Sequence, residues 1–269
     1  MHYLYLKKED FRKYLGFTVS LAEKVASSEN IEHERKLKFL TNSSMGFIKD
    51  MYVEEMDMNQ FSLATDLLVT TIEVMGQDSQ VLSVFEVIKG HSDLLYAHSL
   101  AVSLYSVLIA KEVGWSSPRT CMRLAMCGLT HDLGKKELPK ELIEKPRMQL
   151  TPEEIQLLET HPVRGSELLR CLQGLPEDVA VVAMQHHEDC KGTGYPGQLS
   201  KHRIMPLSRL VAVANEFCHL VFPGPGYPGM PAKDALTRLM TGNSGRFDEQ
   251  FVNALYRVIH PPSKGNKTA

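Results

Sequence analysis

The sequence of 269 residues contains little cysteine, and no two cysteines are spaced as Cys-x-x-Cys. Its five cysteines are an odd number, and most of them fall in apolar runs that are typical of helices. This pattern argues against a framework of disulfides. We therefore expect reduced thiols and a cytoplasmic protein.

A strong net charge and a long apolar run are also missing. The net charge of −2 gives no electrostatic reason to expect binding to long nucleic acids, although local cations can still hold a small phosphorylated ligand. No stretch is apolar over the length that a bilayer requires. Charged residues occupy positions 7–10, where a signal peptide needs its apolar core. We expect neither a membrane span nor a signal peptide.

The alternation of apolar and polar residues that marks strands is absent as well, whereas apolar residues recur at helical spacing. The sequence therefore predicts an all-α fold. Residues 1–85 carry no clustered histidine or cysteine, so we interpret them as a separate helical domain that regulates the protein or forms a homodimer. We expect residues 86–260 to form the domain that holds the candidate chemistry, and the polar residues 261–269 to form a loose tail.

The segment from His131 to Lys135, His-Asp-Leu-Gly-Lys, directly follows the apolar run 121–130, which is typical of a buried helix. Burying an imidazole beside a carboxylate is costly unless both groups have partners. A metal ion is the simplest partner for His131 and Asp132 together.

Further histidines are predicted at or near the ends of other helices: His98, His161, His186 and His187. The helix that leads to His161 begins with a capping box at Thr151. A lone buried histidine such as His98 is more often a satisfied core residue than a ligand, and we interpret His202 and His219 in that way. A solvated helix end would also explain the adjacent pair His186 and His187. Only their occurrence together favours a metal site.

Imidazole and carboxylate form the ligand set of Zn, Fe, Mn or Ni. Six such side chains exceed the needs of one tetrahedral site, so the sequence favours two ions bridged by Asp132. Such a pair is suited to phosphoester hydrolysis, because a hydroxide forms between the ions near neutral pH and both ions stabilise the phosphoryl oxygens. Lys135 lies close enough along the chain to hold a phosphate oxygen.

The segment from about residue 90 to 260 resembles HD-GYP domains, a branch of the HD metal-dependent phosphohydrolases. The resemblance rests on motifs in the same order: Tyr96-Ala-His98-Ser, His131-Asp132-Leu-Gly-Lys135, His161-Pro-Val-Arg-Gly165, His186-His187-Glu188, Gly192-Thr-Gly194-Tyr195-Pro196 and Arg209-Leu-Val-Ala-Val-Ala. It implies an HD-type helical bundle that hydrolyses cyclic di-GMP to linear pGpG, in some members onward to GMP, with two or three metal ions that are often iron.

The resemblance also implies roles for single residues. The side chains that look like metal ligands are His98, His131, Asp132, His161, His186, His187 and, more weakly, Asn215. Asp132 would be the bridging ligand, and Lys135 would contact the phosphodiester or the attacking hydroxide. The positions implied to face substrate or a GGDEF-domain partner are Gly194, Tyr195, Pro196, Lys191 and Arg209.

The chain departs from the family pattern at several of these positions. Leu94 stands where members with a third metal carry Glu, so we expect two ions at most. Asn215 replaces an Asp ligand, and a neutral amide oxygen binds a cation more weakly. Lys191 reverses the charge of an Asp before the Gly-Tyr-Pro loop. The segment 222–230 replaces an Arg-Pro-Tyr segment and removes its cation.

Two functions fit this pattern. The retained histidines and Lys135 favour an active cyclic di-GMP phosphodiesterase with two divalent ions, Fe or alternatively Mn, Ni or Zn. The changes at Asn215, Lys191 and 222–230 favour a weakly active or inactive receptor for cyclic di-GMP, or a docking module for GGDEF proteins. A mononucleotide hydrolase is a third and weaker reading, because residues 192–196 match the cyclic dinucleotide branch.

Overall fold

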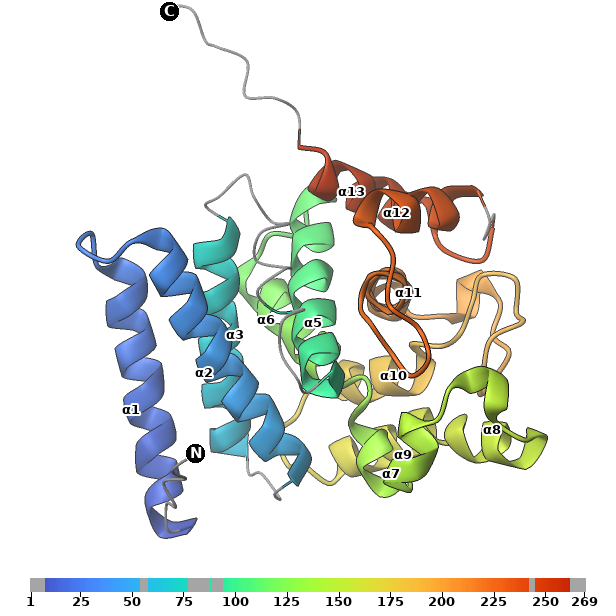
Figure 1. The fold of residues 1–269 in the computed structure, drawn as a ribbon, viewed down its shortest axis with the longest axis horizontal. Helices are drawn as coiled ribbons and strands as arrows, with labels where there is room; N and C mark the ends of the chain where they lie inside the picture. The colour runs from blue at the N-terminus through green and yellow to red at the C-terminus, as the bar shows by residue number, and fades with distance from the viewer. Residues whose placement is uncertain (1–7, 54–57, 77–87, 89–93, 242–244, 262–269) are drawn as a thin grey trace, which may run out of the picture.

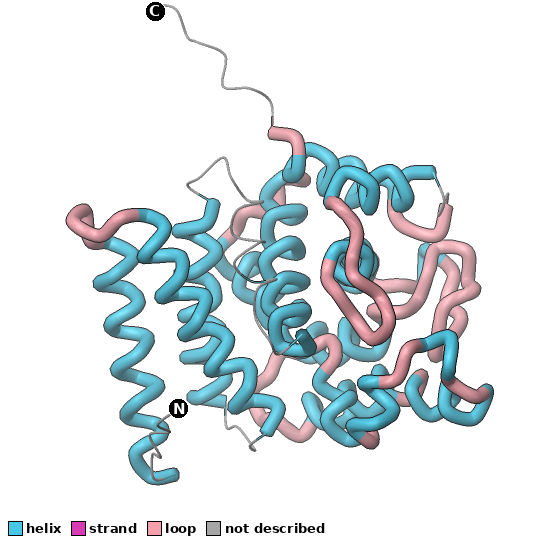
Figure 2. The backbone as a smooth tube through the Cα atoms, in the orientation of Figure 1, coloured by secondary structure: helices cyan, strands magenta, loops and turns pink. Residues whose placement is uncertain are grey.

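A computed structural model describes residues 8–53, 58–76, 88, 94–241 and 245–261. Within these ranges the chain forms helices and connecting loops without any strand, and extended pairing is limited to isolated bridges between Lys191 and Ser200 and between Gly224 and Tyr227. Figure 2 shows helices throughout the molecule. The predicted all-α fold is confirmed.

The N-terminal part consists of three long helices, α1 (Lys8–Ser27), α2 (His33–Val53) and α3 (Met58–Gly76), which lie side by side on the left of Figure 1. Helices α2 and α3 pack against the next part of the chain, and their buried apolar side chains belong to one continuous core with it. The expected domain boundary at residue 85 lies outside the described residues, as does the tail from residue 262 onward.

Helix α5 (Leu94–Glu112) runs through the centre of the molecule and packs against α6 (Pro118–Thr130), α11 (Pro206–Val221) and α13 (Glu249–Ile259). By length and composition α5 is suited to cross a membrane, whereas the sequence led us to expect no such stretch. Because 72% of its most apolar window is buried inside the fold, α5 serves as a core helix.

Shorter elements surround this core. They are α7 (Lys140–Glu144), α8 (Pro152–Leu158), α9 (His161–Arg170), α10 (Glu177–Gln185), α12 (Ala232–Thr241) and the 3-10 turns η1 (Leu133–Glu137), η2 (Arg147–Gln149) and η3 (Lys201–Arg203).

The helix starts follow the sequence signals. Ser117 caps α6 by accepting a hydrogen bond from the amide of Thr120, and Thr151 and Glu154 form the expected capping box of α8. One prediction is wrong, because α8 ends at Leu158 and His161 begins α9 instead of ending α8. Pro162 explains the break, since proline lacks an amide hydrogen and is tolerated only in the first turn of a helix.

Candidate metal centre

The ligand candidates converge from several helix ends. His98 lies near the start of α5, and His131 and Asp132 directly follow α6. His161 begins α9, and residues 186–187 directly follow α10. All of these side chains except His187 are buried to within a few per cent of full burial.

Local helix geometry orients three of the rings. The last carbonyl groups of a helix have no partner within the helix, and a histidine placed three residues later can donate its Nδ1 hydrogen to one of them. That bond holds the ring in place and leaves Nε2 as the free ligand atom. The bonds are each 2.7 Å long and run from His131 to Gly128 O, from His161 to Leu158 O and from His186 to Ala183 O.

The Asp132 carboxylate lies at the centre of the cluster. Its Oδ1 atom is 3.2 Å from Nε2 of His161 and 3.6 Å from Nε2 of His186. Its Oδ2 atom is 3.3 Å from Nε2 of His131 and 4.0 Å from Nε2 of His98. The two oxygens of one carboxylate therefore face two different sets of imidazoles.

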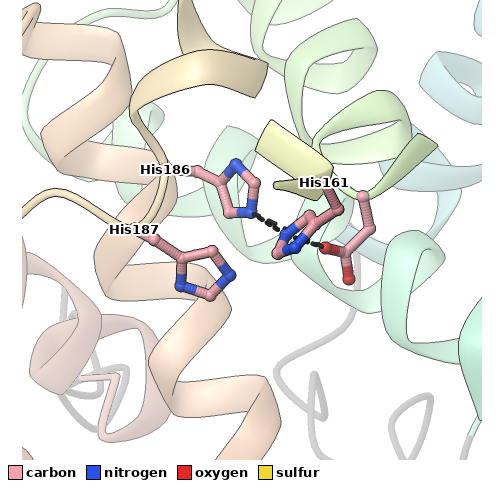
Figure 3. Close-up of side chains that lie close together, drawn as sticks. His161, His186 and His187 are labelled. Carbon is pink, nitrogen blue, oxygen red and sulfur yellow. Dashed lines mark hydrogen bonds and ion pairs between the residues drawn. The ribbon is translucent and has the colours of Figure 1, made fainter. Parts of the chain in front are cut away.

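Ligand atoms within 4.8 Å of one another form two groups that share Asp132: Asp132, His161, His186 and His187; and His98, His131 and Asp132. Figure 3 shows the three histidines of the first group, with His186 and His161 in contact and His187 beside them. Nε2 of His131 is fully buried and has no hydrogen-bond partner among the described residues. Such an atom costs free energy unless a cation satisfies it. This donor set fits a divalent metal ion.

Burial keeps the histidines in the form that binds metals. It lowers the pKa of His98, His161 and His187, and it lowers the pKa of His186 to about 3. Burial alone would raise the pKa of Asp132, but Lys135 and His131 beside it hold that pKa well below its usual range. At neutral pH the rings of His98, His161, His186 and His187 are therefore neutral, and the Asp132 carboxylate is ionised.

Lys135 and Asn215 also reach this cluster. Lys135 Nζ lies 2.6 Å from Asp132 Oδ2, and its side chain is 13% exposed. The amide oxygen of Asn215, on α11, lies 2.8 Å from His98 Nε2 and accepts a hydrogen bond in the tautomer that carries the hydrogen there. Asn215 is therefore adjacent to the second group.

The loop with Gly194, Tyr195 and Pro196 is attached to the last ligand. The Tyr195 ring stacks on the His187 ring, with centroids 4.5 Å apart and planes 18° apart. A Cβ atom on Gly194 would come within 2.4 Å of His187 O, so a side chain there would prevent this approach. Glu188, whose role sequence reasoning missed, accepts hydrogen bonds from backbone amides of residues 197 and 199 and so holds the loop in place.

A cavity opens beside the cluster, and neither Lys191 nor Arg209 is among its lining residues. The Lys191 side chain is exposed, and its backbone forms a bridge to Ser200. Arg209 pairs with Asp248, the N-cap residue of α13. The structure thus uses Arg209 to attach α11 to α13.

A cavity of about 540 Å³ opens beside the cluster. Its lining residues are Leu94, Leu95, Tyr96, His98, Asp132, Lys135, Lys140, Ile143, Glu144, His219 and residues 223–225. His219 is exposed in this cavity, and its ring centroid lies 4.3 Å from that of His98. The interpretation of His219 and His202 as core residues is therefore wrong, since both are exposed.

The comparisons with known proteins agree with this geometry. The model of the HD domain family matches residues 83–251. Among curated relatives, the cyclic di-GMP phosphodiesterase PA4108 of Pseudomonas aeruginosa is 29% identical over 73% of this chain and 47% of its own length. The cyclic di-GMP phosphodiesterase response regulator RpfG of Xanthomonas campestris is 31% identical over 76% of this chain and 54% of its own length.

This chain spans about half the length of these relatives. Among solved structures, Bd1817 of Bdellovibrio bacteriovorus, an HDG"Y"P protein, is 21% identical with a TM-score of 0.78, covering 94% of this chain and 81% of that one. This likeness concerns the fold and includes the N-terminal helices, because the matched share exceeds the part covered by the family model. The chain belongs to the HD domain family, in its HD-GYP branch.

Proposed function

We propose that the chain is a metal-dependent phosphodiesterase that hydrolyses cyclic di-GMP to linear pGpG, with GMP as a further product. The observation that carries the proposal is the Asp132 carboxylate, whose two oxygens face separate groups of imidazoles beside an open cavity. The names of the relatives, both cyclic di-GMP phosphodiesterases, support the choice of substrate.

In this proposal two divalent ions, iron or alternatively Mn, Ni or Zn, are held by the two groups that share Asp132, with Asn215 beside His98. Bound ions would activate water and stabilise the phosphoryl oxygens of the substrate. The chain supplies imidazole rings that are already oriented by their Nδ1 hydrogen bonds, so little reorganisation is needed.

The remaining groups contact the substrate or support a metal ligand. Lys135 lines the cavity and carries an ammonium group next to Asp132, so it is placed to bind an oxygen of the phosphodiester. Tyr195 stacks on His187 and limits the freedom of that ring. The cavity wall formed by Leu94, Leu95 and Ile143 reduces the access of water to the bound substrate.

A second candidate is a receptor that binds cyclic di-GMP with little turnover. Asn215 favours it, because the neutral amide beside His98 brings no charge to the second group. The exposed outer face of the Gly194–Pro196 loop, at Pro196, would then serve as a docking surface for GGDEF-domain proteins. We place both functions in the cytoplasm, since all five cysteines are free thiols.

The test is to incubate anaerobically purified, iron-loaded protein with cyclic di-GMP and to separate the products by chromatography. The phosphodiesterase yields linear pGpG, and the Asp132→Ala variant, prepared in parallel, yields none. Binding of cyclic di-GMP without product would overturn the enzyme and support the receptor. Metal analysis of the same sample gives the number of ions per chain, which we expect to be about two.

A further inference from the structure

His219 occupies a position that the proposed site does not yet use. It lies on α11, four residues after Asn215, and residues four apart project from the same face of a helix. Most side chains from Leu210 to Val221 are buried, whereas His219 is exposed. This exposure is toward the cavity, because His219 is one of its lining residues.

The lining of the cavity contains both ionisable and apolar residues. Its ionisable groups near the metal cluster are His98, Asp132, Lys135 and His219, whereas Leu94, Leu95, Ile143 and the prolines at 223 and 225 are apolar. Lys140 also lines the cavity, but it pairs with Glu144 at 3.4 Å. A phosphodiester anion bound next to the metal cluster would therefore meet His219 as well as Lys135.

A ring nitrogen of His219 is available to donate a hydrogen bond to a ligand in the cavity. One face lies against His98 at a centroid distance of 4.3 Å and an interplanar angle of 31°. Among the described residues neither of its ring nitrogens makes a hydrogen bond, in contrast to the anchored Nδ1 atoms of His131, His161 and His186. Because a neutral imidazole carries one N–H, His219 can donate one hydrogen bond into the cavity.

The loop that follows α11 brings no side-chain hydrogen-bond donor of its own to the cavity. Its backbone turns tightly, with mutual hydrogen bonds of 2.8 and 2.9 Å between Gly224 and Tyr227, and the Tyr227 hydroxyl donates to Leu220 O. The residues that this loop contributes to the cavity, 223–225, are two prolines and a glycine, which bring no charge or side-chain donor. Phosphate binding on this side of the cavity therefore depends on α11.

We propose that His219 is a substrate-binding residue that donates a hydrogen bond to a phosphoryl oxygen of the scissile phosphodiester. This assignment rests on the proposed phosphodiesterase function. A contact with the phosphate is favoured over stacking on a nucleobase, because His98 already covers one face of the ring.

The test compares His219→Leu, which removes the donor, with His219→Gln, which retains an N–H donor. His202→Leu is the matched control, since His202 is exposed on η3 and does not line the cavity. Each metal-loaded variant is assayed for kcat and KM with cyclic di-GMP and with bis(p-nitrophenyl) phosphate, a phosphodiester without bases. Metal content is measured in every sample.

We expect His219→Leu to lower kcat/KM about 10- to 100-fold for both substrates with unchanged metal content, because a hydrogen bond to a charged group is lost. His219→Gln should recover most of this loss, and His202→Leu should match the wild type. A loss confined to cyclic di-GMP would indicate a base contact and overturn the assignment. Loss of metal would make His219 a ligand, and unchanged kinetics would remove it from the site.

Failure of the proposed function gives a different result. If the wild type hydrolyses bis(p-nitrophenyl) phosphate but not cyclic di-GMP, the choice of substrate fails while the phosphate contact is still decided by the simpler ester. If neither ester is hydrolysed, titration calorimetry with inorganic phosphate tests the contact between His219 and phosphate. Weaker phosphate binding by His219→Leu than by the wild type supports the contact, and equal binding overturns the proposal.

Discussion

Gly134 approaches the backbone of His161 so closely that a Cβ atom at position 134 would come within 2.0 Å of His161 O and 2.5 Å of the Gly165 amide nitrogen. This contact joins the turn η1 to the start of α9. Asp132 lies just before that turn, and the contact sets the 3.2 Å distance between its Oδ1 atom and His161 Nε2. A glycine in the His131–Lys135 motif thus serves the metal site through packing.

Gly134→Ala should therefore destabilise the protein and lower its metal content together. A clash with backbone atoms forces η1 away from α9, and overpacking of this kind costs about 1–3 kcal/mol or more. Gly46→Ala is the matched control, since nothing lies within 4 Å of its Cβ position in α2, and the change should stabilise by about 0.5–1 kcal/mol. Urea unfolding and metal analysis measure both effects. Gly134→Ala with wild-type stability would refute the packing argument.

Asp132→Ala should abolish metal loading. The carboxylate belongs to both ligand groups, so its removal leaves neither group with an anionic ligand from the cluster. Asp132→Asn retains the shape without the charge and should also lose most of the metal. Glu144→Gln is the control, because Glu144 lines the same cavity but pairs with Lys140. Elemental analysis of anaerobically purified protein gives the answer, and full metal retention by Asp132→Ala would contradict the assignment.

Much of this cluster could be predicted because local rules place its residues. A histidine just beyond a helix finds an unpaired carbonyl three residues earlier, so the orientations of His131 and His186 follow from where their helices end. The helix break before His161 could also have been predicted, because Pro162 has to lie in the first turn of a new helix.

The surroundings of the cluster could not be predicted in the same way, because they depend on contacts between distant segments. Arg209 pairs with Asp248, which is 39 residues away in the sequence. His219 faces a cavity whose other walls come from α5, η1 and α7. Apolar neighbours in the sequence suggested burial for His219, and only the arrangement of these helices leaves it exposed.

Lys135→Ala should slow turnover about 100-fold while the metal content is unchanged. The ammonium group lies 2.6 Å from Asp132 but also lines the cavity, so its loss removes a cation from the phosphate site. Lys140→Ala is the control, because Lys140 lines the same cavity and is exposed and paired with Glu144. Steady-state kinetics with cyclic di-GMP distinguish the two variants. An unchanged rate in Lys135→Ala would exclude it from the reaction.

Metal-free protein should lose stability as the pH falls from 7.5 to 5.5. Burial lowers the pKa of His186 to about 3, while the unfolded chain binds a proton near pH 6.5. Above about pH 6.5 His186 is neutral in both states and does not lower the free energy of unfolding. Below that pH the free energy of unfolding declines by up to about 1.4 kcal/mol per pH unit, down to about pH 3. His98, His161 and His187 shift in the same direction.

Urea unfolding of chelator-treated protein at the two pH values measures this decline. His186→Gln should show a smaller decline, because one buried titrating ring is removed. Replacement of the exposed His260 by Gln should leave the decline unchanged. Equal stability of the wild type at both pH values would show that these rings are protonated as readily in the folded state as in the unfolded chain.

Asn215→Asp should strengthen metal binding, because it places a carboxylate where the amide oxygen now lies 2.8 Å from His98 Nε2. A charged oxygen ligand in place of a neutral one should raise affinity about 10-fold or more, measured by competition with a chelator. Without metal the same variant should be less stable than the wild type, since a second buried carboxylate beside Asp132 repels the first. Asn253→Asp, an exposed site on α13, controls for the added charge.

If turnover of cyclic di-GMP by Asn215→Asp rises with metal affinity, the missing charge at position 215 limits the enzyme. If affinity rises and turnover does not, the receptor function gains support.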